Sequence, residues 1–471
     1  MKNIFLSKTS YCNSLQCPKM IWLKRYKRDQ AVQQADPKIF ENGKKVGILA
    51  QDLFGKKHDD VAFNYNHFFK YMLEQTDEFL LNKPNIITEA TFNYENNFCM
   101  VDVLKNDTDG VEIYEVKSST KVTDVYIYDA SFQYYVLSNL GFNVKKVCIV
   151  YINNQYVRQK ELDIHELFNI EDITSIALEK QDEIRRNVES INQFMREHNQ
   201  NDEPDIFIGK QCSKPYECDF IEYCTHFSEN SRLTNYLIEE SDVEEEDNAT
   251  IIDKEAIKNL LDSLKYPLYF IDYETYNTPI PEIEGTRPYQ QLPFQYSLHI
   301  LKDENAELEH KEFLADPEDK DFIRHFAESM ISNLPEDGSV IVYNQTFEGT
   351  MVNKELIRMY PDLEEEITRI NSNMVDFMVP FRKKQYYTKE MQGSYSIKYV
   401  LPALYPDDPE LDYINLALVH DGAEASEAFE SLKDKSPEEQ EKIREGLLEY
   451  CKLDTYAMVK IFDKFKEAIE K

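Results

Sequence analysis

Three short groups of polar residues in the second half of the chain have the types and spacing of a site for two divalent metal ions. The first is Asp272-Tyr-Glu274, at the end of an apolar run that begins at Leu268. The alternation of a strand turns both carboxylates toward one face. Two divalent ions roughly 3.5–4 Å apart, held by carboxylates, stabilise the attacking and leaving oxygens in phosphodiester hydrolysis. The first group therefore indicates metal-assisted phosphoryl chemistry.

The other two groups lie where helices are expected. Asn344 and Glu348 follow a second apolar run and are four residues apart, so a helix beginning there places them on one face. Tyr450 and Asp454 are also four apart, in a long amphipathic segment near the C-terminus. One such pair alone is more often solvated surface in a chain that is 30% charged. Together the groups predict one metal site with four carboxylate ligands: Asp272, Glu274, Glu348 and Asp454.

These motifs resemble the signatures of the DnaQ-like exonucleases, which have a ribonuclease-H-like fold. The family pattern is Asp-x-Glu, then Asn-x-x-Phe-Asp, then Tyr-x-x-x-Asp or His-x-x-x-x-Asp. In this chain Glu348 replaces the usual Asp, and Glu449 stands at the His position. The resemblance implies the tyrosine subclass of 3′–5′ exonucleases, with two Mg²⁺ or Mn²⁺ ions and with Tyr450 orienting the attacking water.

Further residues of this half concern the substrate. The resemblance implies substrate contacts by Asn344 and by Lys398, which ends the segment Ser394-Tyr-Ser-Ile-Lys398. The aromatic-rich residues 287–296 have two interpretations, stacking on unpaired bases or packing into the sheet. Asp376 is interpreted as a solvated or capping residue, with a secondary catalytic acid as the alternative.

The first half carries a second acidic pattern. Residues 86–118 predict three strands, and residues 123–141 predict a helix. Asp102 lies on the second strand, and Glu115-Val-Lys117 lies on the third. Two carboxylates and a lysine can hold a metal ion and orient an attacking water at one phosphate.

This pattern resembles the RecB-like branch of the PD-(D/E)XK nucleases. The resemblance implies an active-site role for Gln133, which shares a helical face with Asp129, and a further acid at Glu89. Where many members have a metal-binding His, this chain has Gln51, which is a poorer ligand. His58 is interpreted as a surface residue rather than a substitute. We therefore expect lower metal occupancy at this site than at the site in the second half of the chain.

The spacing of three cysteines indicates a metal centre. Cys212, Cys218 and Cys224 recur every six residues, and eight cysteines in a long chain of this kind do not predict a disulfide framework. Some RecB-like nucleases, including exonucleases of CRISPR adaptation, hold a four-iron, four-sulfur cluster with one N-terminal and three later cysteines. The resemblance therefore implies a [4Fe–4S] ligand set of Cys17, Cys212, Cys218 and Cys224.

Two alternatives stay open for this centre. Four thiolates suit zinc as well as iron and sulfur, and the preference for a cluster comes from the resemblance. Cys12 competes with Cys17 as the fourth ligand. Cys99, Cys148 and Cys451 are interpreted as buried small apolar residues.

Length and charge limit the protein class. A chain of 471 residues predicts two or three domains. Its formal net charge of -34 argues against nonspecific coating of phosphate backbones, although bound metal and local basic clusters are compatible with a nuclease. The apolar runs are too short for a membrane span and the first residues lack a signal-peptide core, so we expect a cytoplasmic protein without a membrane partner.

The predicted fold class is α/β with two domains. Residues 1–230 are expected to form the RecB-like nuclease with a restriction-endonuclease-like core, residues 231–254 an acidic linker, and residues 255–471 the DnaQ-like domain, a mixed sheet flanked by helices. The pairing looks like an uncharacterised bacterial family with that C-terminal domain. The function implied is processing of DNA that is single-stranded or has free ends. The alternatives are an end-binding or assembly protein with one or both sites vestigial, and an exoribonuclease.

Overall fold

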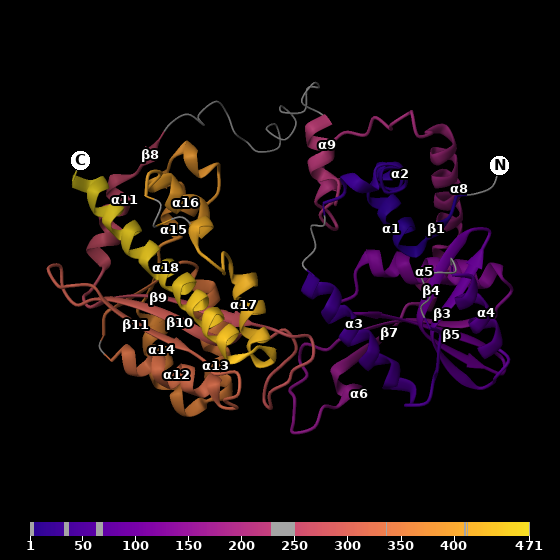
Figure 1. Cartoon of the computed structure of the whole chain (residues 1–471), viewed down its shortest axis with the longest axis horizontal. Coiled ribbons are helices and arrows are strands. Elements are labelled where there is room, and N and C mark those ends of the chain that lie inside the picture. The colour runs from indigo at the N-terminus through magenta and orange to yellow at the C-terminus, as the bar shows by residue number, and fades with distance from the viewer. Residues whose placement is uncertain are drawn as a thin grey trace. The chain divides into compact units, whose positions relative to one another are not determined.

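The computed structural model describes residues 4–32, 37–62, 69–227, 250–335, 337–408, 411 and 413–470. Its sheets and helices confirm the α/β class (Figure 1). The chain divides into two compact units, Met1–Asp242 with Pro279–Pro288, and Val243–Thr278 with Tyr289–Lys471. Most of the predicted acidic linker, residues 231–249, lies outside the described residues. None of the helices in the described part of the chain is long and apolar enough to cross a membrane.

A seven-stranded sheet forms the centre of the first unit, in the order β2-β3-β4-β5-β6-β7 with β1 beside β4. The central strands β3, β4 and β5 are antiparallel, and β6 is parallel to β5. A parallel neighbour needs a crossover connection, and the helix α5 (Asp124–Asn139) supplies it. The three predicted strands and the predicted helix are confirmed. The strands are β1 (Leu6–Ser7), β2 (Asp59–Asp60), β3 (Asn85–Tyr94), β4 (Asn97–Asp107), β5 (Gly110–Lys117), β6 (Val144–Ile152) and β7 (Phe168–Asp172).

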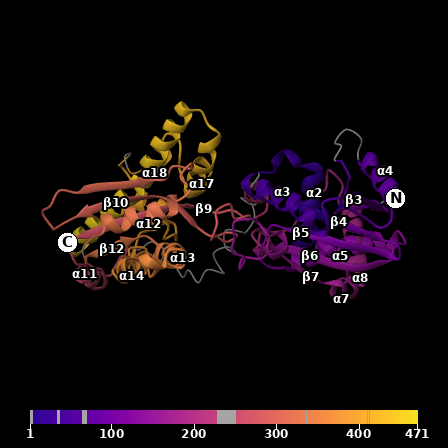
Figure 2. The ribbon, with the colours of Figure 1, turned by 90° about the horizontal axis from the view of Figure 1, so that it is seen from below.

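Helix α5 packs on this sheet through Ala130, Phe132 and Val136, which are fully buried. Figure 2 shows α5, α7 and α8 together below the sheet. The other α-helices are α1 (Lys8–Gln16), α2 (Pro18–Tyr26), α3 (Pro37–Gln51), α4 (Lys70–Phe79), α6 (Ile164–Leu167), α7 (Thr174–Glu179), α8 (Gln181–Glu197) and α9 (Ile221–Phe227).

The polar, helix-like sequence pattern from Asp163 to Gln200 does not form one continuous helix. Strand β7 interrupts it and pairs antiparallel with β6. Phe168 is buried there at 5% exposure, while Ile170 on the same strand is 47% exposed. Hydrogen bonding to the edge of the sheet determines the conformation of this segment, because local polarity does not distinguish a surface helix from an edge strand.

The second unit contains a mixed five-stranded sheet in the order β11-β10-β9-β12-β13. Strand β10 is antiparallel to β9 and β11, whereas β12 is parallel to β9 and β13. A two-stranded pair, β8 with β14, lies outside this sheet. The strands are β8 (Ile251–Ile252), β9 (Leu268–Tyr276), β10 (Leu292–Leu301), β11 (Glu309–Leu314), β12 (Ser339–Val342), β13 (Met374–Asp376) and β14 (Tyr386–Tyr387).

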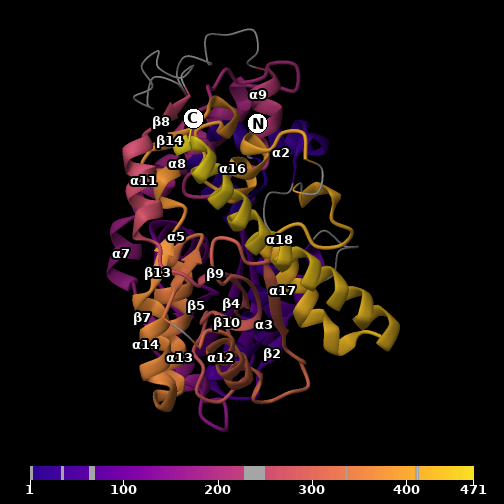
Figure 3. The same cartoon turned by 90° about the vertical axis from the view of Figure 1, so that its left-hand side faces the viewer.

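Helices cover both faces of this sheet. Figure 2 shows α18 above the strands and α12 and α14 below them, and Figure 3 shows α11 and α16 beside α18. Phe462 and Phe465 of α18 pack on Phe270 and Phe377, so the long helix is held by the core. The helices are α11 (Lys254–Ser263), α12 (Phe322–Asn333), the π-helix η6 (Thr346–Val352), α13 (Asn353–Met359), α14 (Glu364–Ser372), α15 (Val379–Arg382), α16 (Ile397–Leu404), α17 (Gly422–Ser431) and α18 (Pro437–Glu470).

The stacking interpretation of residues 287–296 is wrong for its two later aromatic residues. Phe294 and Tyr296 lie on β10 and are fully buried in the sheet. They cannot reach a base, so the packing alternative is confirmed for them.

Candidate metal sites

Four acidic side chains of the second unit gather from three elements. Asp272 and Glu274 come from the central strand β9, Glu348 from η6 and Asp454 from α18. Ligand atoms of Asp272 and Glu274 lie within 4.8 Å of each other and of the thiol of Cys451. Asp454, Glu274 and Glu348 each raise the pKa of Asp272 through their charge. The structure therefore brings the four predicted ligands into one cluster.

Burial disfavours the charged form of these carboxylates when no cation is bound. Removal from water, followed by repulsion from Asp454, raises the pKa of Asp272 and of Glu274 well above the usual range. Burial also raises the pKa of Glu348 to about 8 and that of Asp454 to about 6. Glu348 is 1% exposed, and its Oε2 has no hydrogen-bond partner among the residues that the structure describes. An orphaned carboxylate oxygen among acids fits hard divalent cations, which prefer oxygen ligands.

The shared helical face predicted for Asn344 and Glu348 is wrong. Asn344 precedes the helix with a φ of 116°, and its backbone N–H donates to Asp376 (3.2 Å). Asp376 also accepts from the backbone N–H of Met378 (2.9 Å), so its carboxylate binds two backbone N–H groups, although the N-cap of α15 is Met378 and not Asp376. Glu348 instead lies in a π-helix, a conformation that is rare and often found at functional sites. Sequence spacing cannot reveal such a change of helical period.

Two tyrosines hold Asp454. The hydroxyl of Tyr413 donates to Asp454 Oδ1 (2.6 Å), and Tyr450 also forms a hydrogen bond with this carboxyl. The ring centroids of Tyr413 and Tyr450 lie 6.0 Å apart. Sequence reasoning missed Tyr413, because it lies in a short 3-10 turn without a motif or periodicity.

Two more residues lie near these acids. Lys398 is exposed on α16, and its charge lowers the pKa of both Glu274 and Asp454. The thiol of Cys451 contacts the backbone carbonyl of Asp272 at 3.8 Å. Cys451 is buried as predicted, but its place beside two predicted ligands was missed, because only the packing of α18 on β9 creates it.

We expect the metal-free second unit to lose stability as pH rises. Glu348 has a folded-state pKa of about 8 against 4.5 ordinarily, so the folded unit keeps this proton up to about pH 8 while the unfolded chain loses it near pH 4.5. The contribution to stability is therefore fully present below pH 4.5 and is lost as the pH rises through 8. Thermal unfolding in a chelator should therefore show a falling midpoint across this window, and Mg²⁺ should reduce the fall. Glu348→Gln should flatten the dependence. A midpoint that rises with pH in the parent protein would contradict the assignment.

The first unit holds a second buried cluster of charged side chains. Lys117 Nζ lies 2.6 Å from Glu115 Oε1 and 2.6 Å from Asp129 Oδ2. Gln133 Nε2 donates to Glu115 Oε2 at 2.6 Å, while Gln133 Oε1 is buried and has no hydrogen-bond partner in the described part of the chain. Glu115 is 1% exposed. The predicted residues of β5 and α5 therefore meet in one network.

The ladder of strands β4 and β5 ends at this cluster, while β3 and β4 stay paired on both sides of it. The ladder between β4 and β5 begins at Val103, and the Asp102 carboxylate instead accepts from the backbone N–H of Val116 (2.7 Å). On β3, Glu89 has a φ of 53° and is skipped in the register opposite Asp102. Burial and the charge of Asp102 raise the pKa of Glu89 to about 7. A left-handed residue inside a strand is strained and re-aims its side chain, as at many functional sites.

One residue of this cluster, Lys8, was missed in the sequence. Its Nζ contacts both oxygens of Glu115, at 2.8 and 3.0 Å. Nothing in the sequence relates Lys8 to acids a hundred residues away, because only the packing of α1 on α5 brings them together. Gln51 ends α3, and His58 pairs with Asp60 and lies 3.5 Å from Asp52.

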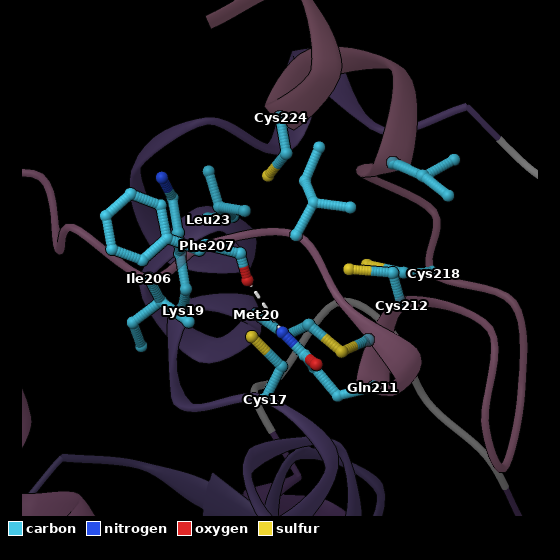
Figure 4. Close-up of a pocket in the computed structure, with 12 residues that line it drawn as sticks. Cys17, Lys19, Met20, Leu23, Ile206, Phe207, Gln211, Cys212, Cys218 and Cys224 are labelled. Atoms are coloured by element: carbon cyan, nitrogen blue, oxygen red, sulfur yellow. Dashed lines mark hydrogen bonds between the residues drawn. The ribbon is translucent and has the colours of Figure 1, made fainter. Parts of the chain in front are cut away.

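The four predicted cysteine ligands line one cavity (Figure 4). Cys17 begins α2, Cys212 ends a 3-10 turn, Cys218 lies in the following loop and Cys224 lies on α9. Met20, Leu23 and Ile221 complete the apolar wall. Burial raises the pKa of Cys224 to about 11, and the charges of the other three cysteines add to this rise.

The donor set of this cavity fits a thiolate-bound metal centre. Negatively charged thiolates repel one another in an apolar cavity, and bound cations stabilise them.

Cys12 does not line this cavity. Its thiol contacts the backbone carbonyl of Val125 at 4.0 Å. The charge of Asp129 raises the pKa of this thiol, and the charges of Lys117 and Lys8 lower it. The structure therefore favours Cys17 over Cys12 as the fourth member of the cysteine set.

Comparisons with known proteins match parts of this chain. An uncharacterised protein of Ureaplasma parvum serovar 3 is 26% identical over 168 residues, which are 33% of this chain and 24% of the relative. An uncharacterised protein of Mycoplasma genitalium is 26% identical over 235 residues, 45% of this chain and 34% of the relative. The chain thus spans about a quarter to a third of the length of these curated relatives. No solved structure matches the chain. A family model described as "Domain of unknown function (DUF2779)" matches residues 269–396, the part that contains Asp272, Glu274 and Glu348.

Proposed function

We propose that this protein is a metal-dependent nuclease that removes nucleotides from the 3′ ends of DNA through its second unit. The observation that carries the proposal is the convergence of Asp272, Glu274, Glu348 and Asp454 in one buried cluster that includes an unpaired carboxylate oxygen. The mixed sheet with helices on both faces supports a ribonuclease-H-like fold for this unit.

Each residue has a proposed role in the second unit. The four carboxylates would hold two Mg²⁺ or Mn²⁺ ions, which supply charge stabilisation for the attacking and leaving oxygens when bound. Tyr450 would orient the attacking water, and Tyr413 would fix the Asp454 carboxylate through its 2.6 Å hydrogen bond. Lys398, exposed and electrostatically coupled to Glu274 and Asp454, would contact a substrate phosphate.

For the first unit we propose a second nuclease site on a RecB-like PD-(D/E)XK core. Strands β3, β4 and β5 and the crossover helix α5 support this core, because they carry the clustered acids and Gln133. Asp102, Glu115 and Glu89 would hold a metal ion, and Lys117 would orient water. A [4Fe–4S] cluster on the four cysteines of the cavity would join α2 to the α9 segment, with zinc as the alternative occupant.

The assay that tests the function uses anaerobically purified protein and 5′-end-labelled oligonucleotides. With Mn²⁺, single-stranded DNA should give a ladder of labelled products that shortens from the 3′ end, and a chelator should abolish it. A 3′-labelled strand should release labelled mononucleotide at once. Double-stranded DNA and RNA in parallel distinguish the substrate alternatives. Metal-dependent binding of ends without cleavage would replace the nuclease proposal by an end-binding function.

A further inference from the structure

Lys8 places a positive charge among the acids of the first-unit cluster. It is the first residue of α1, and Ser7 caps this helix by accepting from the backbone N–H of Ser10 (3.1 Å). Its Nζ lies 2.8 Å from Glu115, 3.8 Å from Asp102 and 4.0 Å from Asp129. The side chain is 18% exposed. One ammonium group therefore lies within 4.0 Å of three carboxylates that come from β4, β5 and α5.

This position conflicts with direct metal binding by the same acids. Both oxygens of Glu115 accept from Lys8, and they also accept from Lys117 and Gln133 at 2.6 Å. Carboxylate oxygens lie about 2.0–2.6 Å from a bound divalent ion. An ion that ligates Glu115 and Asp102 would lie within a few ångströms of the ammonium and would repel it strongly, because the site is largely buried.

We propose that Lys8 is a built-in counter-ion of the first-unit site, and that a divalent cation must displace its ammonium group in order to bind. This inference rests on the proposed metal function of that site. Without metal, Lys8 compensates the buried charges and stabilises the unit. With metal, its side chain leaves Glu115 and moves toward solvent. The second-unit cluster carries Lys398 on its exposed rim and contains no comparable internal lysine among its described contacts. The two sites should therefore load at different metal concentrations.

A titration with Mn²⁺, in which the electron paramagnetic resonance signal measures free Mn²⁺, directly tests the competition between the metal ion and the Lys8 ammonium group. The full chain carries Asp272→Asn to weaken the second site, and Asp102→Asn in that background identifies the first-unit ion. Lys8→Met should lower the Mn²⁺ dissociation constant of the first-unit site roughly tenfold or more, because the competing charge is gone. Lys8→Arg, which keeps the charge, should leave the constant close to that of the parent. Lys145→Met is the matched control, since Lys145 pairs with Asp109 at 2.9 Å on the surface of the same unit.

Chemical labelling gives a readout independent of affinity. An amine-reactive reagent followed by mass spectrometry should label Lys8 slowly without metal and faster with Mn²⁺, while Lys145 is labelled at the same rate in both. In addition, Lys8→Met without metal should unfold at a lower temperature than the parent, and Mn²⁺ should stabilise the variant more.

The outcomes separate the inference from the function on which it rests. An equal or weaker first-unit Mn²⁺ affinity in Lys8→Met overturns the role of Lys8 and leaves the metal site intact. No first-unit Mn²⁺ in the parent, Lys8→Met or Lys8→Arg overturns the metal function of the site and this inference with it. Labelling of Lys8 that does not change with Mn²⁺ also overturns the displacement.

Discussion

An Asp272→Asn variant is expected to release nucleotides from single-stranded DNA roughly 10³-fold more slowly than the parent, or slower still. Asp272 lies on the central strand β9 and interacts with Asp454, Glu274 and Glu348, so its loss removes a charged ligand from the middle of the cluster. The variant should fold, because an amide relieves like-charge repulsion among buried acids. Its thermal midpoint without metal should equal or exceed that of the parent, which separates lost chemistry from lost structure.

The matched control for this variant is Asp262→Asn. Asp262 is exposed on α11 and pairs with Lys258 four residues earlier, so its loss should leave the rate unchanged. Lys117→Met reports on the first unit in the same assay. If Asp272→Asn keeps the parent's rate while Lys117→Met abolishes release, the first unit is the principal nuclease and the assignment to the second unit is wrong.

A Cys212→Ser variant is expected to lose the brown colour and iron absorbance of the cofactor-loaded protein and to unfold at a lower temperature. The cavity joins Cys17 on α2 to the segment that holds Cys212, Cys218 and Cys224, which closes a loop of almost the whole first unit. Metal–thiolate binding couples to folding. A loss of ~3 kcal/mol would lower the midpoint of a unit of this size by roughly 10 °C.

Cys148→Ala is the control for this cysteine variant. Cys148 is a buried cysteine of β6 in the same unit and does not line the cavity, so its replacement should keep the colour and the iron content. A colourless parent with stoichiometric zinc would replace the cluster by zinc. A parent that binds neither metal under anaerobic purification would overturn the metal centre, and the cavity would then be a packing defect between α2 and α9.

The sequence alone predicted the elements whose pattern is local. The strands that carry Asp102, Glu115 and Asp272 and the helices that carry Gln133 and Asp454 are present near the predicted positions, because period-two and helical periodicity report burial of one face directly. The sequence did not reveal edge strand β7 or the π-helix of Glu348, since hydrogen bonding to a neighbouring strand and a local change of helical period have no signature in residue spacing.

Residue type and spacing thus predicted three groups of side chains as candidate sites: the acids in two groups and the cysteines in a third. Only the tertiary structure decided which of these side chains lie together and which other residues contact them. It chose Cys17 over Cys12, and it added Tyr413 to Asp454 and Lys8 to Glu115. The physical reason is that charge interaction depends on distance in space, and Lys8 and Glu115, which are 107 positions apart, come within 3 Å only through the packing of the folded unit.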